Sequence, residues 1–597
     1  MAKTPNPVAR QTLRYRGKDY DGNYKYSYVP RSVAVGVEGV SQSRCPFLKV
    51  SRQALLAALT ASSREILVHY FPAFPGSLDN ASLPDAYEDY LTPGGAGDTA
   101  GYGGYLRERP QYQAPLLDAT SPADQEYEDA QMREELMRLS RLGVSVVTPD
   151  ILGSPQIERA QRCAALIDAE FPDMKFAPML DMNSATVAAD YISAANFTDL
   201  FTSAANRWLD PDDGNMIVAC FETSGPNFTG TQWGDYIAYM LSQYATGVNI
   251  MHVGQILGVP SKLDTLLTDL ETHTAGYAAR MPYVGPWGAG YSAYGDTTLP
   301  LWKGQVEGGV TYAQAMDFVW PITPQVVRAK SNWYQGAENF DTLLNQLQGM
   351  VSGDPSTWPR FANIVTWNDV SEATHFVPTP TNGGAYYRLL EYYLQYFATE
   401  SEPVITQDTI FYSYRSQLTT ATPVGGAAQS DPFDQNAGTF DDQIQMLVFL
   451  SDDATLEIEF NGSTTQYSAS AGIDSFKVTA AAASAPVFRI IRDSRIIEEI
   501  TGATDIVDTY DVQDPTYFAG TSRNVRPLSS SASNLFVSAP WRYGNYLATG
   551  VDATLTPSEL ESPFPRAGIT ERPALRFESL DELITTGVGW SFLPDGS

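Results

Sequence analysis

The feature that most constrains the fold is an alternation of short apolar runs with helical stretches over residues 65–402. The runs at 65–70, 144–148, 175–181, 216–221, 248–253, 282–285 and 363–367 have the length and apolarity of buried parallel strands. Helical patterns occupy 124–142, 154–170, 184–195, 235–244, 262–273, 337–350 and 385–399. Since no Gly-rich nucleotide-binding fingerprint follows the first strand, the alternation predicts a (β/α)8 TIM-type barrel rather than an open nucleotide-binding sheet.

The pattern changes after residue 402, where short strands follow one another without intervening helices. Strands are expected at 408–415, 443–450, 456–460, 464–468, 475–479 and 487–491, with a hairpin turn at Asn461-Gly462. We therefore expect a β-sandwich-like domain over residues 403–505 behind the barrel of residues 65–402. Residues 1–64 form an N-terminal extension and residues 506–597 an extended C-terminal region.

Charge and composition exclude several classes of function. The chain of 597 residues has a net charge of −31, which argues against phosphate-mediated binding of nucleic acid. Residues 1–64 are the exception, because they carry eleven Lys or Arg against three acids. Such a basic arm on an acidic body predicts a docking segment with a partner of its own.

Other absences narrow the chemistry. Three Cys and four His show no disulfide or metal-binding spacing, so no metal and no cofactor are expected. No run reaches the ~18 apolar residues of a membrane span, and residues 1–7 lack the apolar core of a secretory signal. Neither a nucleophile elbow nor a phosphate-binding Gly loop is present.

Acidic residues recur where the predicted barrel strands end: Asp150, Asp181, Glu222, Asp369 and Glu372. One acid after one strand usually caps the next helix, but several would converge at the mouth of a barrel. Glycoside hydrolysis needs two carboxyl groups, one as acid and one as base or nucleophile. Eight of the ten Trp lie between Trp208 and Trp367, and indole faces stack well on sugar rings.

An ordered set of motifs resembles the fungal-type α-1,3-glucanases, or mutanases, over roughly residues 65–505. The matching segments are Val68-His69-Tyr70, Pro178-Met-Leu-Asp181-Met182, Ala219-Cys-Phe221-Glu222-Thr-Ser-Gly225, Gly285-Pro286-Trp287, Lys330-Ser-Asn332-Trp333 and Val365-Thr-Trp367-Asn368-Asp369-Val-Ser-Glu372-Ala, followed by Asp408–Arg415 and Val448-Phe449-Leu450 in the β domain. The chain departs from the family pattern at Val370-Ser371, which replaces Tyr-Gly, and by one extra residue between Glu372 and His375.

This resemblance implies inverting hydrolysis of an α-1,3-glucan-like polysaccharide by Asp369 and Glu372, with Glu372 as general acid and Asp369 as base. Further candidates for contact with the substrate are Asp150, Asp181, Glu222, His69, Tyr70, Trp287, Trp333, Trp367 and Asn368.

Two other functions remain open from the sequence, a carbohydrate-binding adhesin and a structural particle protein, each on an inactive barrel. The implied substrate lies outside cells while no signal peptide is visible. We therefore expect extracellular action, with delivery through docking of the basic arm into a larger assembly such as a phage particle.

Overall fold

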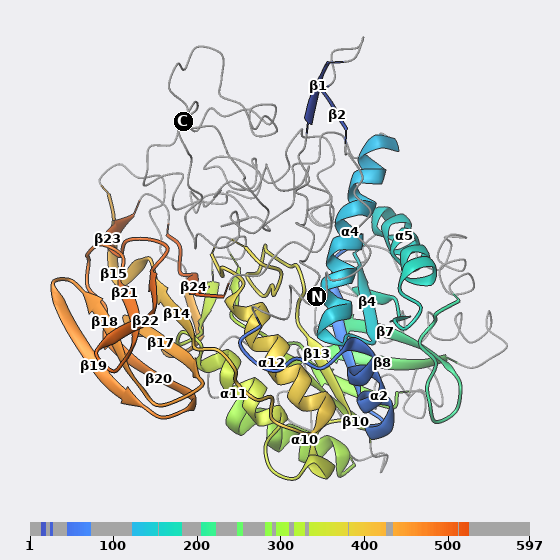
Figure 1. Ribbon diagram of the computed structural model, residues 1–597. Helices are drawn as coiled ribbons and strands as arrows, with labels where there is room; N and C mark the ends of the chain where they lie inside the picture. The colour runs from blue at the N-terminus through green and yellow to red at the C-terminus, as the bar shows by residue number, and fades with distance from the viewer. Residues whose placement is uncertain are drawn as a thin grey trace, which may run out of the picture.

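The computed structural model describes residues 14–18, 24–27, 45–72, 122–152, 154–181, 205–222, 248–254, 281–288, 294–309, 316–328, 333–379, 381–424, 434–510 and 513–523. Within these residues a parallel barrel wrapped by helices lies beside a β domain, drawn in orange in Figure 1.

The barrel is one parallel sheet whose pairings return to their starting strand. Its strands are β3 (Glu65–Tyr70), β4 (Val146–Ile151), β5 (Lys175–Phe176), β6 (Met179–Asp181), β7 (Met216–Glu222), β8 (Val248–Gly254), β9 (Tyr283–Pro286), β10 (Asp317–Ile322) and β13 (Phe361–Ile364). The order β3-β13-β10-β9-β8-β7-β6-β4 closes because β4 also pairs with β3, while β5 lies beside β4 just before β6. This is a TIM-like ring, as the sequence predicts.

Helices surround the described part of this ring. They are α2 (Arg52–Ser62), α4 (Pro122–Leu142), α5 (Ser154–Glu170), α10 (Leu299–Glu307), α11 (Asp341–Met350) and α12 (Ala385–Thr399). The helices expected at 184–195, 235–244 and 262–273 lie outside the described residues. Sequence reasoning missed both α10 and β10. β10 was missed because Pro321 interrupts its apolar run, although the strand pairs with β9 and β13.

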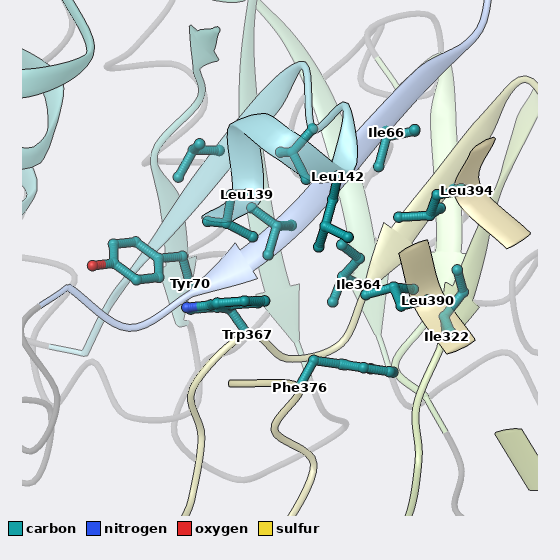
Figure 2. Packing of buried hydrophobic residues seen from close by; sticks show 14 of the residues in the cluster. Ile66, Tyr70, Leu139, Leu142, Ile322, Ile364, Trp367, Phe376, Leu390 and Leu394 are labelled. Carbon is teal, nitrogen blue, oxygen red and sulfur yellow. The ribbon is translucent and has the colours of Figure 1, made fainter. Parts of the chain in front are cut away.

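Strand alternation divides the barrel side chains between two cores. Leu67, Ile217 and Phe361 belong to a cluster inside the ring. Their strand neighbours, such as Ile66 and Ile364, pack outward against α4 and α12, together with Leu142 and Leu390 (Figure 2). A side chain's place in the alternation therefore decides whether it faces the barrel interior or the helices.

The β domain is a sandwich of two antiparallel four-stranded sheets. One sheet has the order β20 (Gly472–Thr479), β17 (Gln443–Leu450), β14 (Thr409–Arg415), β24 (Tyr517–Thr521), and the other β19 (Ser463–Ala469), β18 (Ala454–Phe460), β21 (Val487–Arg492), β22 (Arg495–Thr501). Ile410 and Tyr412 face the second sheet, whereas Phe411 joins the core of the barrel helices. Strands β14, β17 and β24 are thus buried on both faces, which explains their continuous apolar runs, whereas the edge strand β20 is half-exposed.

The β domain continues past the boundary expected at residue 505. Strand β24 completes the first sheet, and β23 (Val507–Tyr510) pairs with β15 (Gln417–Pro423). A three-stranded sheet joins this domain to the barrel, because β12 (Trp333–Gly336) pairs with both β11 (Val327–Arg328) and β16 (Asp434–Gly438). The Asn461-Gly462 turn has positive φ at both residues, as a tight hairpin requires.

The N-terminal extension divides into two parts. Arg14–Lys18 (β1) and Tyr24–Ser27 (β2) form an antiparallel pair. Residues 45–62 instead belong to the barrel, because Phe47 packs edge-on against Tyr392 of α12 and Leu55 and Leu59 of α2 are buried. The expectation of one docking arm over residues 1–64 is therefore corrected: its C-terminal third is a barrel component.

Cys45, Cys163 and Cys220 are free and buried, which fits their interpretation as core thiols. None of the described helices has the length and apolarity needed to cross a membrane.

Candidate functional site

The carboxyl ends of the barrel strands gather the candidate residues at one end of the ring. Because all strands run parallel, His69 at the end of β3, Asp150 on β4 and Asp181 at the end of β6 lie at the same end. Each continues the inward-facing alternation of its strand, as Leu67, Val146 and Met179 show. The strand ends thus supply a cluster of polar groups to the barrel mouth.

His69 and Asp150 form a buried pair across the neighbouring strands β3 and β4. The Nε2 atom of His69 lies 2.9 Å from Oδ2 of Asp150, and the two side chains are 0% and 2% exposed. Nδ1 of His69 and Oδ1 of Asp150 have no hydrogen-bond partner of good geometry within the described residues. Buried polar atoms without a partner are costly, which makes the pair a candidate for a functional role.

Burial governs the ionisation of this pair. It lowers the pKa of His69 from 6.5 to about 4, although the negative charges of Asp181, Asp369 and Glu372 oppose the fall. Burial also raises the pKa of Asp150 well above 3.8; the amide of Ile151 opposes this rise and the charge of Glu372 adds to it. The charges of Asp181, Asp369 and Glu372 therefore act on His69, and the charge of Glu372 also acts on Asp150.

A tight turn after β13 carries Asp369 and Glu372. The hydroxyl of Thr366 accepts from the amide of Asp369 at 2.8 Å. Oδ1 of Asp369 accepts from the Ser371 hydroxyl at 2.6 Å and from the Glu372 amide at 3.0 Å. Ser371, one of the two departures from the family pattern, therefore helps to fix the Asp369 carboxylate, which is 5% exposed.

An arginine that sequence reasoning missed fixes the second carboxylate. Arg328 Nη2 lies 2.8 Å from Oε1 of Glu372, and its guanidinium stands 5.2 Å from the ring centre of Trp333. The amide of Val327 donates to the carbonyl of Glu372 at 2.8 Å, so β11 is attached to the turn by main chain as well. The β11-β12-β16 sheet thus connects the candidate carboxylate to the β domain.

Aromatic rings border this cluster. Trp287, which directly follows β9, stands edge-on to His69 at 4.5 Å and contacts Phe221 at 4.7 Å. Phe221 was not singled out from the sequence, although its place two residues after the inward-facing Ala219 predicts an inward ring. Phe71 stacks on the imidazole of His69, with 5.2 Å between the ring centres.

Three residues expected to contact the substrate are buried behind the strand ends in this structure. Tyr70 and Trp367 are fully buried in the core between sheet and helices (Figure 2). The Tyr70 hydroxyl donates to Glu135 of α4 at 2.6 Å, because Tyr70 occupies an outward-facing position of β3. Asn368 holds the main chain of Phe71 through its amide oxygen at 2.9 Å and its amide nitrogen at 2.7 Å.

Glu135 was missed, although one signal could have found it. It lies on the same face of α4 as Met132, Leu136 and Leu139, and a carboxylate on an apolar helix face needs a buried partner. Tyr70 and Asn368 are those partners, at 2.6 and 3.4 Å.

Glu222 ends β7, and its side chain lies outside the described residues. Within the part of the chain that is described, no group of His, Cys and acidic side chains could hold a metal ion.

Two hollows of about 470 and 660 Å³ lie at the other end of the barrel. They share Lys303, Thr357 and Trp358, and the larger one reaches Asp317 and Arg360, where β10 and β13 begin. Catalytic groups of such barrels occupy the carboxyl ends of the strands, so we place the site there and not in these hollows.

A TIM-like barrel with carboxylates and indole rings gathered at the carboxyl ends of its strands has the arrangement of a glycoside hydrolase. Residues 302–523 match the model of glycosyl hydrolase family 71. The match spans β10, the turn with Asp369 and Glu372, and the β domain through β24.

The chain is also similar to individual proteins. The glucan endo-1,3-alpha-glucosidase agn1 of Schizosaccharomyces pombe is 24% identical over 390 residues, covering 61% of this chain and 83% of that protein. Among solved structures, the GH99 endo-alpha-mannosidase from Bacteroides thetaiotaomicron aligns with a TM-score of 0.37 and 12% identity, covering 56% of this chain and 97% of the other. A modular endo-beta-1,4-mannanase from Cellulomonas fimi aligns with a TM-score of 0.30 and 9% identity, covering 78% of this chain and 99% of the other.

Residues 302–523 are thus similar to glycosyl hydrolase family 71, and the chain is distantly similar to agn1. The resemblance to α-1,3-glucanases seen in the sequence is thereby confirmed.

Proposed function

We propose that the protein hydrolyses an α-1,3-glucan-like extracellular polysaccharide with inversion of the anomeric centre, using Asp369 and Glu372. One observation carries the proposal: a single turn after β13 holds both carboxylates at the barrel mouth, where their charges act on His69 beside Trp287. Two carboxyl groups and an aromatic wall are what glycoside hydrolysis needs.

The two carboxyl groups take different roles in this proposal. Asp369 acts as the base that activates water, because two donors on its Oδ1 favour the ionised form that a base requires. Glu372 acts as the general acid, and Arg328 Nη2, 2.8 Å from its Oε1, stabilises the carboxylate that remains once the proton has passed to the leaving group. Inversion requires the two carboxyl groups to lie roughly 6.5–9.5 Å apart, with a water between them and the sugar.

Release of reducing sugar from a panel of α- and β-linked glucans tests the activity. We expect hydrolysis of α-1,3-glucan, with Asp369→Asn and Glu372→Gln each reducing turnover by several orders of magnitude, since each removes a proton-transfer partner. Glu307→Gln, a change in a carboxylate on α10, is the matched control and should retain wild-type turnover. Near-normal hydrolysis by both site variants would refute the assignment, and glucan binding without any hydrolysis would favour an adhesin.

A substrate with a good leaving group separates the two roles. α-Glucosyl fluoride needs little acid assistance, so Glu372→Gln should lose far less activity on it than on glucan. Asp369→Asn should lose activity on both substrates. If Asp369→Asn instead kept its activity on the fluoride while Glu372→Gln lost it, Asp369 would be the acid and Glu372 the base. An initial product of retained configuration, observed by NMR, would exclude inversion.

Delivery of the enzyme is a separate proposal. The basic arm would dock the protein into a larger assembly such as a phage particle, and the barrel would then act on surface glycan outside the cell. Residues 1–44 hold eight Lys or Arg against three acids, which supports an electrostatic contact with an acidic partner. Deletion of residues 1–44, which spares the barrel component that begins at Cys45, should abolish incorporation and leave hydrolysis intact. Purified particles that never contain the protein would exclude docking.

A further inference from the structure

The buried pair of His69 and Asp150 lies among further carboxylates whose charges act on it. The charged groups that act on it within the described residues are Asp181 from β6 and Asp369 and Glu372 from the segment after β13. Arg328 of β11, which is bound to Glu372, is the cation of this cluster. A further full charge on Asp150 would repel these carboxylates in a region of low dielectric constant.

The hydrogen bonds of the pair indicate where its proton lies. If Asp150 were ionised and His69 neutral, Nε2 of His69 would carry the hydrogen and Nδ1 would be a bare acceptor. Oδ1 of Asp150 would then be a buried anionic oxygen without a well-placed donor. If Asp150 is protonated, its hydroxyl donates to Nε2, the hydrogen of His69 lies on Nδ1, and Oδ1 is a neutral carbonyl oxygen, which costs less to bury without a donor than an anionic oxygen does.

We propose that Asp150 is a carboxylic acid at neutral pH and that, through Nε2 of His69, it fixes the imidazole as a neutral Nδ1–H donor beside the catalytic carboxylates. His69 and Asp150 are positioning residues in this arrangement. Burial of both side chains, which depresses the pKa of the imidazole to about 4 and raises that of the carboxyl, supports the same protonation state. The pair would therefore provide a hydrogen-bond donor at Nδ1 of His69 while both side chains stay uncharged.

This arrangement differs from the common one, in which an ionised Asp orients a His and stabilises its charged form. The two arrangements predict different effects of an Asp150→Asn substitution. An amide at position 150 can donate to Nε2 as a protonated carboxyl group does, whereas in place of an ionised carboxylate it removes the charge and, with its nitrogen turned to Nε2, gives the opposite tautomer.

The tautomer itself can be observed without measuring any activity. With ¹⁵N-labelled histidine, the chain gives signals from only four imidazoles, and the His69→Gln variant assigns those of residue 69. We expect a neutral imidazole with hydrogen on Nδ1 at pH 7, and the same tautomer in Asp150→Asn. Hydrogen on Nε2, or a cationic ring, would overturn the proposal. This result does not depend on which polysaccharide is cleaved.

The kinetic consequence rests on the proposed hydrolase function. Asp150→Asn should lower kcat/KM on glucan by less than tenfold at pH 6, whereas an ionised Asp150 predicts a loss on the order of a thousandfold or more. Asp150→Ala, which removes the donor, should lose far more than Asp150→Asn. A large loss in Asp150→Asn would overturn the proposal.

The alkaline limb of the pH profile gives the last comparison. In the wild type, ionisation of Asp150 at high pH adds a charge near Glu372 and reverses the tautomer, so kcat/KM should fall. Asp150→Asn cannot ionise, and its profile should lack this fall. An identical alkaline limb in both proteins would contradict the proposed role of the pair. If no glucan is hydrolysed at all, the proposed function fails while the tautomer measurement still decides the state of the pair.

Discussion

Glu391 of α12 is the residue whose loss should damage the barrel most clearly. It is buried and accepts from Arg388 at 2.7 Å and from Lys49, so it joins the N-terminal segment to a barrel helix. Burial by itself would raise the pKa of Glu391, but the charges and hydrogen bonds of Lys49 and Arg388 outweigh it and lower the pKa from 4.5 to about 2. Glu391→Gln keeps the shape of the side chain and removes the charge.

The pKa difference sets the size of the effect. A group that is fully buried and titrates near 2 instead of 4.5 contributes about 3 kcal/mol to the free energy of unfolding at neutral pH. Removing one partner of a buried ion pair typically costs roughly 3–5 kcal/mol, which agrees with the value from the pKa difference. Because the folded pKa of Glu391 is lowered, this stability is present above pH 4.5 and is lost as the pH falls toward 2.

Urea unfolding followed by tryptophan fluorescence suits the test, since eight of the ten Trp lie between Trp208 and Trp367. Glu391→Gln should lose about 3 kcal/mol at pH 7, and its difference from the wild type should shrink below pH 4.5. The control Glu307→Gln removes a partly exposed i,i+4 pair with Lys303 and should cost about 0.3–0.5 kcal/mol. A loss below 1 kcal/mol at pH 7, or one that does not change with pH, would refute the reasoning.

Three further variants test the site and its support. Tyr70→Phe removes the 2.6 Å bond to Glu135 and should cost about 1–3 kcal/mol in unfolding experiments, with KM unchanged because the ring lies behind the site; a raised KM would return Tyr70 to the substrate groove. Trp287→Ala should lower kcat/KM at least about tenfold, or 1.4 kcal/mol, through loss of the aromatic wall, with the unfolding midpoint as control. Arg328→Gln releases Glu372 and should lower kcat more than it raises KM, measured by initial rates on glucan; an effect on KM alone would make Arg328 a substrate ligand.

The sequence by itself determined the class of fold and the position of the candidate carboxylates. Periodicity predicted β3, β4, β7, β8 and α12, because short apolar runs and amphipathic stretches reflect burial directly. It also marked Asp150, Asp181 and Asp369, since parallel strands bring all their carboxyl ends to one face. Periodicity did not predict β10, because Pro321 is unfavourable in a central strand and the strand forms through its pairing with β9 and β13.

Tertiary structure alone decided which polar and aromatic residues face the site. Tyr70 and His69 are neighbours in sequence, yet strand alternation sends one to α4 and the other to Asp150. Arg328 and Glu372 are far apart along the chain, and no local pattern links a strand of the β11-β12-β16 sheet to a turn after β13. Local periodicity records how much of a side chain is buried, whereas the partner it is buried against depends on the closure of the barrel and on the docking of the β domain.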